Sequence, residues 1–152
     1  AAMKRIWIDA GKCDGCLNRT LACMNAHRAD KGSIYDLDLT DPSNESRGFI
    51  HRQPGGSYRP IFCRHCDEPE CVNSCMSGAL SRNRKTGIVE YDEKRCAGCF
   101  MCVMNCPFGV LKPDTAARSR IIKCDFCKDS GSEPSCVKAC PKKAIWIEEV
   151  QS

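Results

Sequence analysis

The sequence lacks the features that define most enzymes and membrane proteins. Only 7% of its 152 residues are aromatic, and no apolar stretch approaches the length of about 20 residues that a membrane-spanning helix requires. It contains no glycine-rich string of the dinucleotide- or phosphate-binding kind, and no Ser–His–Asp or paired-carboxylate arrangement stands out. We therefore expect no membrane span, no nucleotide site and no catalytic residues of these kinds.

Charge is also distributed without a dominant feature. The formal net charge is +4, but lysine and arginine are scattered and form no long basic run, so a nucleic-acid partner is not expected. No apolar signal region follows Lys4 and Arg5, which favours a cytoplasmic location. A reducing cytosol would in turn keep thiols free and disfavour disulfides.

Cysteine is present in great excess, with fifteen copies. Such a density has three physical explanations, namely a disulfide scaffold, zinc sites or iron–sulfur clusters. The cysteines fall into four blocks, each opening with a C-x2-C pair. The blocks are Cys13-x2-Cys16-x6-Cys23 (block one), Cys63-x2-Cys66-x4-Cys71-x3-Cys75 (block two), Cys96-x2-Cys99-x2-Cys102-x3-Cys106 (block three) and Cys124-x2-Cys127-x8-Cys136-x3-Cys140 (block four).

Block three is the most specific signal, because C-x2-C-x2-C-x3-C followed by Pro107 is the spacing of bacterial ferredoxins. Three cysteines at this spacing surround one cluster, and the fourth faces a neighbouring cluster. Zinc sites instead group their cysteines as two pairs that close on one metal. His27, His51 and His65 are too few and too dispersed for mixed zinc sites. The spacing therefore predicts iron–sulfur clusters.

Short apolar runs flank the cysteine blocks. They predict strands at residues 5–8, 87–91 and 144–147. Residues 83–87 have the composition of a hairpin turn, which would pair residues 79–81 with the strand that follows. The residues just before each closing cysteine suit a single helical turn.

Residues 28–60 differ from the rest of the chain. They contain no cysteine and are rich in Asp, Ser, Gly and Pro. We expect an excursion loop there. It would either contact a partner or cover the edge of a cluster.

The four blocks together resemble a family of four-cluster ferredoxin-like iron–sulfur subunits, found in molybdenum and tungsten oxidoreductases, hydrogenases, and formate and carbon monoxide dehydrogenases. The resemblance covers residues 4–150 and rests on the strings CRHCDEPECVNSCMSGAL, CAGCFMCVMNCPFGVL, CDFC and CVKACPKKAI. It implies an α+β fold with little regular secondary structure, organised around the clusters. Two pseudo-symmetric ferredoxin-like modules would share one compact chain: an inner module of residues 61–106, and an outer module of residues 1–27 plus 107–152.

In that family the second block pairs with the third, and the first block pairs with the fourth. The resemblance therefore implies four groups of metal ligands. They are Cys63, Cys66, Cys71 and Cys106 (site one), Cys96, Cys99, Cys102 and Cys75 (site two), Cys124, Cys127, Cys136 and Cys23 (site three), and Cys13, Cys16 and Cys140 (site four). The first three sites are complete and imply three [4Fe-4S] clusters.

Site four departs from the family pattern, because Arg19 stands where another cysteine is expected. An arginine has no lone pair to offer to iron. The site can hold a [3Fe-4S] cluster on three thiolates, or a [4Fe-4S] cluster completed by a residue such as Asp14, Asn18 or His27. It can also be empty, with Arg19 filling the space. We favour an occupied site, because three cysteines remain together.

The resemblance implies an electron-transfer subunit rather than a catalyst. Single electrons would pass through the clusters to or from a catalytic subunit in a hetero-oligomer, in the cytoplasm of an anaerobe. The favoured partner is a tungsten or molybdenum enzyme of the aldehyde oxidoreductase type, including aromatic acyl-CoA reductases. The alternatives are carbon monoxide dehydrogenase, hydrogenase and formate dehydrogenase. A rival interpretation is an iron–sulfur redox sensor or scaffold protein, although a sensor typically needs only one labile, exposed cluster.

Overall fold

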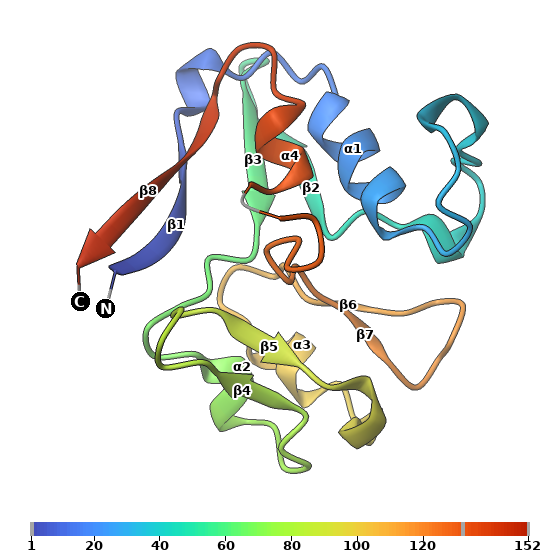
Figure 1. Ribbon diagram of the computed structural model, residues 1–152, viewed down its shortest axis with the longest axis vertical. Helices are drawn as coiled ribbons and strands as arrows, with labels where there is room; N and C mark the ends of the chain where they lie inside the picture. The colour runs from blue at the N-terminus through green and yellow to red at the C-terminus, as the bar shows by residue number, and fades with distance from the viewer. Residues whose placement is uncertain (1, 132, 152) are drawn as a thin grey trace.

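The computed structural model describes residues 2–131 and 133–151 as short helices and strands separated by turns (Figure 1). The expected mixture of both element types is confirmed. In chain order the α-helices are α1 (Asn18–His27), α2 (Glu70–Asn73), α3 (Met101–Asn105) and α4 (Ser135–Lys138). The 3₁₀ helices are η1 (Ala10–Lys12), η2 (Ile34–Asp36), η3 (Pro42–Asn44) and η4 (Glu93–Arg95). The strands are β1 (Ala2–Ile8), β2 (Gly48–Arg52), β3 (Tyr58–Phe62), β4 (Leu80–Arg82), β5 (Val89–Tyr91), β6 (Lys112–Pro113), β7 (Ile121–Ile122) and β8 (Ile145–Gln151).

The strands of the described residues form four antiparallel pairs, β1–β8, β2–β3, β4–β5 and β6–β7. The β1–β8 pair joins the two ends of the chain, with Trp7 opposite Trp146. In Figure 1 this pair, the β2–β3 pair and helices α1 and α4 form one half of the molecule. The β4–β5 pair with α2 and α3 forms the other half, and β6 and β7 lie beside the junction.

The predicted hairpin between residues 79 and 91 is confirmed as the β4–β5 pair. Its turn is held by Asn83, whose side-chain oxygen accepts hydrogen bonds from the backbone N–H groups of Lys85 and Thr86. Gly87 closes the turn at a φ of +70°, a conformation that glycine adopts without steric cost. The other two predicted strands are confirmed within β1 and β8.

The expectation of a loop over residues 28–60 is wrong for its second half. Residues 48–52 form β2, which pairs with β3 in a hairpin. Gln53 and Ser57 bracket the turn, where the Ser57 carbonyl accepts a hydrogen bond from the Gln53 N–H. Glycines in a turn of this length between two apolar runs are a hairpin signal. Pro60 obscured it, although a strand of a two-stranded sheet has a free edge that tolerates proline.

The apolar core is small and contains a cysteine. Leu80, Val89, Leu111 and Ile121 pack together with Cys102, all of them buried. This core connects the β4–β5 hairpin to β7. A domain with so few buried aliphatic side chains has little hydrophobic stabilisation of its own, which leaves room for bound inorganic groups to contribute.

Helix α1 is longer than the single turn that we expected before Cys23. It spans ten residues, from Asn18 to His27. The run includes Leu21, Ala22 and Met24, which are strong helix formers, so the turn around the cysteine continues into a full helix.

Candidate metal centres

The four C-x2-C turns share one backbone feature. In each of them the residue directly before the second cysteine has a positive φ; these residues are Gly15 (+74°), His65 (+47°), Gly98 (+68°) and Phe126 (+62°). For the two side-chain-bearing residues this conformation costs about 1–2 kcal/mol. Turns of this kind direct successive N–H groups into one concavity, which suits an anion. The repeated left-handed conformation therefore indicates a repeated anionic ligand.

The cysteines assigned to site one lie close together. Burial, together with the nearby thiolates of Cys63, Cys106 and Cys66, raises the pKa of Cys71 to about 11. Burial also raises the pKa of Cys66, where Cys63 and Cys106 contribute in the same direction. Thiols such as Cys66 and Cys71, whose neighbours oppose their ionisation, need a cation to hold them as thiolates, and a metal core would supply it.

The cysteines assigned to site two line one small cavity of about 20 Å³. Its four cysteines are Cys75, Cys96, Cys99 and Cys102. The apolar side chains of Leu80, Phe100 and Ile121 line the same cavity. Burial raises the pKa of Cys102, and the thiolates of Cys75 and Cys96 add to the shift.

The cysteines assigned to site three are brought together from α1, the start of block four and α4. Burial raises the pKa of Cys136 to about 11, with further contributions from the thiolates of Cys23 and Cys127. Burial also raises the pKa of Cys124, where Cys63 of site one and Cys23 contribute in the same direction. Sites one and three are therefore neighbours.

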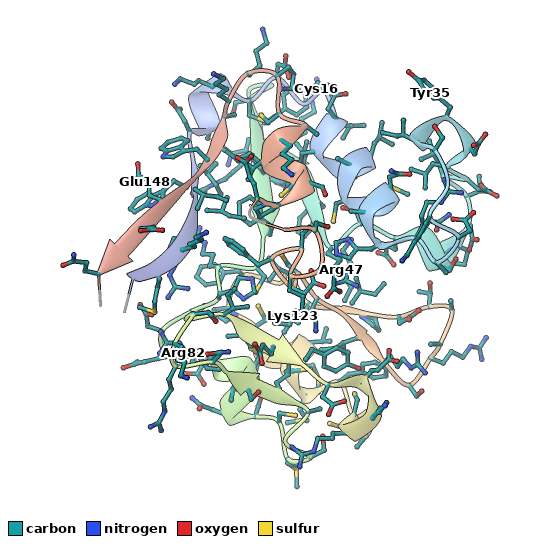
Figure 2. The ribbon with its side chains drawn as sticks, viewed as in Figure 1. Cys16, Tyr35, Arg47, Arg82, Lys123 and Glu148 are labelled. Atoms are coloured by element: carbon teal, nitrogen blue, oxygen red, sulfur yellow. The ribbon has the colours of Figure 1, made fainter. Side chains whose placement is uncertain are left out.

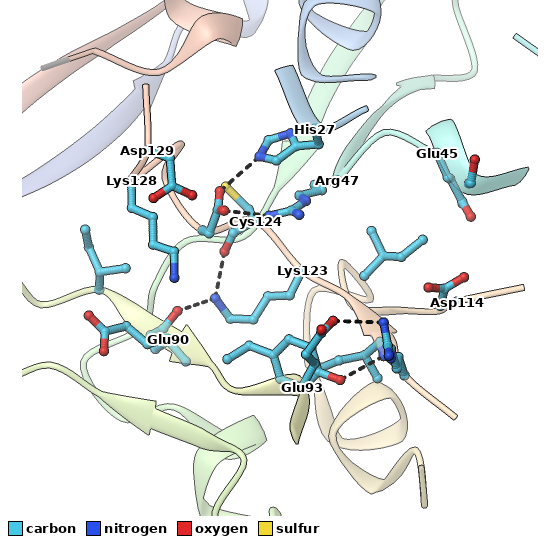
Figure 3. A pocket seen from close by; sticks show the side chains of 18 of the residues that line it. His27, Glu45, Arg47, Glu90, Glu93, Asp114, Lys123, Cys124, Lys128 and Asp129 are labelled. Atoms are coloured by element: carbon cyan, nitrogen blue, oxygen red, sulfur yellow. Dashed lines mark hydrogen bonds and ion pairs between the residues drawn. The ribbon is translucent and has the colours of Figure 1, made fainter. Parts of the chain in front are cut away.

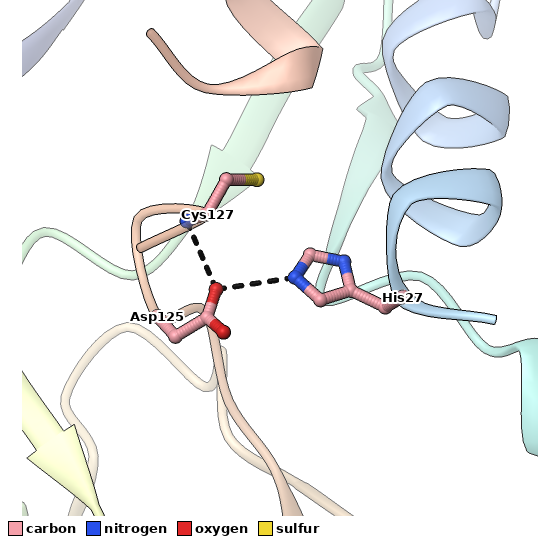
Figure 4. A group of neighbouring side chains, drawn as sticks. All are labelled: His27, Asp125 and Cys127. Carbon is pink, nitrogen blue, oxygen red and sulfur yellow. Dashed lines mark hydrogen bonds and ion pairs between the residues drawn. The ribbon is translucent and has the colours of Figure 1, made fainter. Parts of the chain in front are cut away.

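A hydrogen-bonded histidine lies beside site three (Figure 4). The Nε2 atom of His27 is 3.1 Å from Asp125 Oδ1, and Nδ1 is 2.8 Å from the Cys23 carbonyl oxygen. Asp125 Oδ1 also accepts the N–H of Cys127 at 2.9 Å. Burial lowers the pKa of His27, but its hydrogen bonds with Asp125, Cys127 and Cys23 outweigh burial and raise it to about 12. His27 is thus engaged at site three, not at site four as one of our alternatives had it.

Site four has the same kind of cavity as site two. A volume of about 20 Å³ is lined by Cys13, Cys16 and Cys140, together with Asp14 and Arg19. The Asp14 carboxylate already accepts the N–H of Cys16 at 3.2 Å. Arg19 is 7% exposed, and its Nη2 atom donates to the Phe49 carbonyl at 2.6 Å.

The position of Arg19 corresponds to that of Cys102. Helices α1 and α3 both follow a C-x2-C turn, and both begin after a residue in the left-handed conformation, Leu17 and Phe100 respectively. Arg19 and Cys102 are each the second residue of their helix. The same backbone path therefore presents a guanidinium at site four and a thiol at site two.

A cavity of about 510 Å³ forms a groove between the two halves (Figure 3). Charged side chains of both signs line it, including Glu93, Arg120, Lys123 and Asp125. Lys123 is only 4% exposed, and its Nζ atom donates to the Val89 carbonyl at 2.5 Å and the Cys124 carbonyl at 2.8 Å. Sequence reasoning missed this lysine, because the Val89 carbonyl that holds it lies on a distant strand.

Several buried polar groups have no partner of suitable charge. Within the described residues neither Arg19 nor Lys123 forms an ion pair with a carboxylate, and Arg19 Nε and His65 Nε2 have no hydrogen-bond partner. His65 Nδ1 accepts the Val89 N–H at 3.0 Å, so Nε2 carries the proton. Burying a charged group without an opposite charge beside it costs several kcal/mol per ion. An anionic group next to these donors would provide the compensation.

The sulfur spacing also favours clusters over zinc. All fifteen cysteines are free thiols. Thiolates on one tetrahedral zinc ion, each about 2.3 Å from it, lie roughly 3.8 Å apart. Among the described residues no three cysteine sulfurs lie within 4.8 Å of one another. The wider groups, with their N–H donors, fit iron–sulfur clusters, in which each thiolate binds a different iron.

Comparison with known proteins agrees with this geometry. Residues 55–150 match the family model described as a 4Fe-4S dicluster domain. The chain belongs to this 4Fe-4S dicluster family. Our expectation of an iron–sulfur family is thereby confirmed. In the part of this dicluster protein that the structure describes, no helix has the length and apolar character needed to cross a membrane.

Two bacterial relatives of this dicluster protein are similar over most of its length. It is 35% identical to the probable anaerobic dimethyl sulfoxide reductase chain YnfG of Escherichia coli K12, over 95% of this chain and 73% of the relative. It is 35% identical to the thiosulfate reductase electron transfer subunit PhsB of Salmonella typhi, over 90% of this chain and 71% of that protein.

A solved structure is similar over the whole chain. A chain of the active site complex BamBC of benzoyl coenzyme A reductase, in complex with 1,5 dienoyl-CoA, aligns with a TM-score of 0.57 and 25% identity. The alignment covers 100% of this dicluster protein and 79% of the BamBC chain.

Proposed function

We propose that the chain is an electron-transfer subunit that relays single electrons through iron–sulfur clusters to or from a catalytic oxidoreductase subunit. The observation that carries this proposal is the adjacency of the cysteine groups. Burial raises the pKa of Cys124 at site three, and Cys63 of site one is close enough to contribute in the same direction. Burial lowers the pKa of Arg19, and thiolates of both site three and site four act in the opposite direction. Neighbouring one-electron sites form a path along which charge can move.

The proposed ligands are the four groups that the family resemblance implies. Sites one, two and three would each hold a [4Fe-4S] cluster on four thiolates, and sites one and two would exchange ligands between blocks two and three. The shared cavity of Cys75, Cys96, Cys99 and Cys102 supports the assignment of site two. The contributions of Cys63 and Cys106 to the raised pKa values of Cys66 and Cys71 support the assignment of site one.

For site four we propose a [3Fe-4S] cluster on Cys13, Cys16 and Cys140. Three thiolates suffice for three irons, and the volume of the cavity equals that of the site-two cavity. The Asp14 carboxylate already accepts a hydrogen bond from the Cys16 N–H, and Arg19 cannot ligate iron, so neither residue supplies a fourth ligand.

We further propose that the fold consists of two pseudo-symmetric modules, the inner one at residues 61–106 and the outer one at residues 1–27 plus 107–152. Equivalent hydrogen bonds support this. The Asp9 N–H donates to the Ala144 carbonyl at 2.7 Å, and the Asp92 N–H donates to the Ala79 carbonyl at 2.8 Å. Each aspartate caps a 3₁₀ helix that leads into a C-x2-C turn. The helix pair α1 and α4 in one module corresponds to α3 and α2 in the other.

In the proposed relay, the protein holds the clusters, shields them from water and tunes their reduction potentials. When bound, the clusters supply one-electron chemistry without proton transfer. The left-handed turns direct backbone N–H groups toward the ligands, and the buried rings of Phe62 and Phe126 exclude water. The ring of His65 packs edge-on against Phe126, with the ring centres 5.8 Å apart, where sites one and three meet. Shielding of this kind lowers the local dielectric, so nearby charges act more strongly on each site.

The favoured partner is a tungsten or molybdenum subunit of the aldehyde oxidoreductase type, including aromatic acyl-CoA reductases. The likeness to a BamBC chain over the full length of this protein supports that choice. The relatives that take part in dimethyl sulfoxide and thiosulfate reduction support the broader class of anaerobic oxidoreductases. The free state of all fifteen cysteines fits a reducing cytoplasm, where we propose that the complex works.

Anaerobic purification of the tagged chain from its native host tests the proposal. We expect about fifteen irons per chain, from three four-iron clusters and one three-iron cluster, and a co-purifying subunit that contains tungsten or molybdenum. Oxidised protein should show the EPR signal of a three-iron cluster, and reduced protein the signals of four-iron clusters. A colourless preparation, or one with zinc in place of iron, would refute the assignment. About twelve irons and no three-iron signal would refute the occupancy of site four alone.

A further inference from the structure

The loop of residues 28–47, between α1 and β2, is fastened to the protein at its base. The Arg47 backbone N–H donates to Cys23 Sγ at 3.4 Å, and Arg47 Nη1 lies 2.7 Å from Asp125 Oδ2. The other oxygen of this carboxylate, Oδ1, is 3.1 Å from His27 Nε2 at the end of α1. The base of the loop therefore covers site three, which is one of the two roles expected of this segment.

The tip of the same loop is held in one conformation by hydrogen bonds. The buried Arg28 guanidinium pairs with Asp30. It also donates to the Ser33 carbonyl at 2.8 Å and to the Asp36 carbonyl at 3.2 Å. The Ser33 side chain in turn caps the start of η2. Because the tip is ordered before any partner arrives, binding would cost little further conformational entropy.

Three apolar side chains of this tip are exposed to solvent. The exposed fraction is 94% for Tyr35, 61% for Leu39 and 44% for Ile34. Figure 2 shows Tyr35 at the outer edge of the molecule, with its ring directed away from the body of the protein. A single exposed apolar residue needs no explanation, but three on one short, ordered loop form a patch. Tyrosine is also among the residues that most often anchor protein–protein interfaces.

Acidic side chains surround this patch. Residues 30–45 contain five acidic residues and one basic residue, although basic residues outnumber acidic ones in the whole chain by 23 to 19. Asp36, Asp38 and Asp41 are exposed, and in the part of the chain that the structure describes none of them forms an ion pair. A complementary surface therefore has an apolar pocket with lysine or arginine at its rim.

The cavities described above do not make a second copy of this chain a suitable partner. The groove between the two halves is lined by six carboxylates and four lysine or arginine side chains, so it would repel an acidic tip. The two cavities of about 20 Å³ are lined by the cysteines of sites two and four. A different protein is the better match for the tip.

We propose that the tip at residues 33–41 docks the catalytic subunit, with Tyr35 and Leu39 inserted into an apolar pocket of that subunit that is rimmed by lysine and arginine. The inference rests on the proposed function, which requires a catalytic subunit, and it names the surface of this chain that binds it. Because the base of the loop covers site three, docking at the tip places the partner against the half of the molecule that contains sites three and four.

Anaerobic purification of the native complex, through a tag on this chain, tests the docking surface. Tungsten or molybdenum per chain measures the catalytic subunit that remains after a fixed wash, and iron per chain shows whether the clusters assembled. We expect Tyr35→Ala to retain at most about one tenth of the wild-type tungsten or molybdenum at unchanged iron, because the ring anchors the interface. Tyr35→Phe keeps the ring and should retain most of it.

The acidic rim is tested by a change of charge. Asp36 is exposed, so Asp36→Lys reverses a charge at the rim with little effect on the fold. We expect this variant to retain an amount of catalytic subunit between those of the wild type and Tyr35→Ala. The wild-type complex should also lose more of that subunit as the salt concentration of the wash is raised, because salt screens exposed charges.

Two exposed side chains elsewhere on the chain serve as matched controls. Met76→Ala removes an apolar side chain that is 92% exposed, and Glu149→Lys reverses an exposed charge on β8. Both should retain the wild-type amount of tungsten or molybdenum. Wild-type retention by Tyr35→Ala, or an equal loss in the controls, would refute the inference. Wild-type retention by Asp36→Lys would refute the basic rim of the pocket.

Two further outcomes would also overturn the inference. If the chain expressed without the catalytic subunit is a dimer by light scattering, and Tyr35→Ala makes it a monomer, the tip binds a second copy instead. Wild-type protein that carries its iron but no tungsten or molybdenum would refute the proposed partner, and this inference with it. Equal tungsten or molybdenum in the wild type and Tyr35→Ala would refute the docking surface alone.

Discussion

The turn at Cys96–Phe100 and the turn at Cys13–Leu17 are nearly the same structure with different contents. Each follows a 3₁₀ helix capped by an aspartate, places a glycine at positive φ before its second cysteine, and leads into an α-helix through a left-handed residue. At the second position of that helix one turn presents Cys102 and the other presents Arg19. The comparison teaches that the backbone cradle is specified by caps and turn residues rather than by the third cysteine. A ligand can therefore be exchanged without loss of the fold.

The largest effect is expected when Cys102 of site two is replaced by arginine, the side chain at the equivalent position of site four. Cys102 is buried among Leu80, Val89, Leu111 and Ile121, so Cys102→Arg would place a charge in the apolar core. Unpaired burial of this kind costs several kcal/mol, in addition to the lost ligand. We expect loss of about four irons per chain and a clear drop in thermal stability, measured by iron assay and by the anaerobic melting temperature.

The isosteric variant Cys102→Ser separates the two effects of that change. It removes the thiolate but adds no charge, so it should lose iron from site two and keep most of the thermal stability. Retention of the full iron content by Cys102→Arg would contradict the ligand role of Cys102.

The reverse exchange sharpens the comparison with a smaller effect. Arg19→Cys supplies the missing thiolate in a cradle that already has the right shape, at the expense of the hydrogen bond to Phe49. We expect one additional iron per chain and disappearance of the three-iron EPR signal after anaerobic reconstitution. Arg19→Ala is the matched control, since it removes the guanidinium without adding a ligand. The same spectrum for both variants would show that position 19 does not face the cluster.

Features that depend on local residue spacing could be predicted from the sequence. The cysteine spacing predicted the family, and the turn at Asn83–Gly87 predicted the β4–β5 hairpin. The β2–β3 hairpin was missed because Pro60 and the surrounding polar residues favour a loop in any local assessment. Burial of Lys123 could not be predicted, because the Val89 carbonyl that holds it comes from a distant strand, and only the folded chain brings the two together. The same holds for the engagement of His27 with Asp125.

The subtlest test of the comparison concerns the glycines that shape the turns. An alanine at Gly98 would take a φ of +68°, and its Cβ would lie 3.1 Å from backbone atoms of Ser119. Gly78 has the same φ of +68°, but a Cβ there would meet no atom within 4 Å, so Gly78→Ala measures the conformational strain alone. That strain is roughly 1–2 kcal/mol in both variants.

At Gly15 a Cβ would lie 2.7 Å from the ring of Tyr58, a side chain that can rotate away, whereas the backbone at Ser119 can move only with its loop. We therefore expect iron release to a chelator to accelerate most in Gly98→Ala, less in Gly15→Ala and least in Gly78→Ala. Release is an irreversible process, so its rate rather than an equilibrium free energy is the quantity to compare. Equal rates of iron release for Gly98→Ala and Gly78→Ala would mean that the whole turn around the cluster shifts to accommodate the added Cβ. The backbone would then follow the cluster instead of being set in advance by its caps and turns.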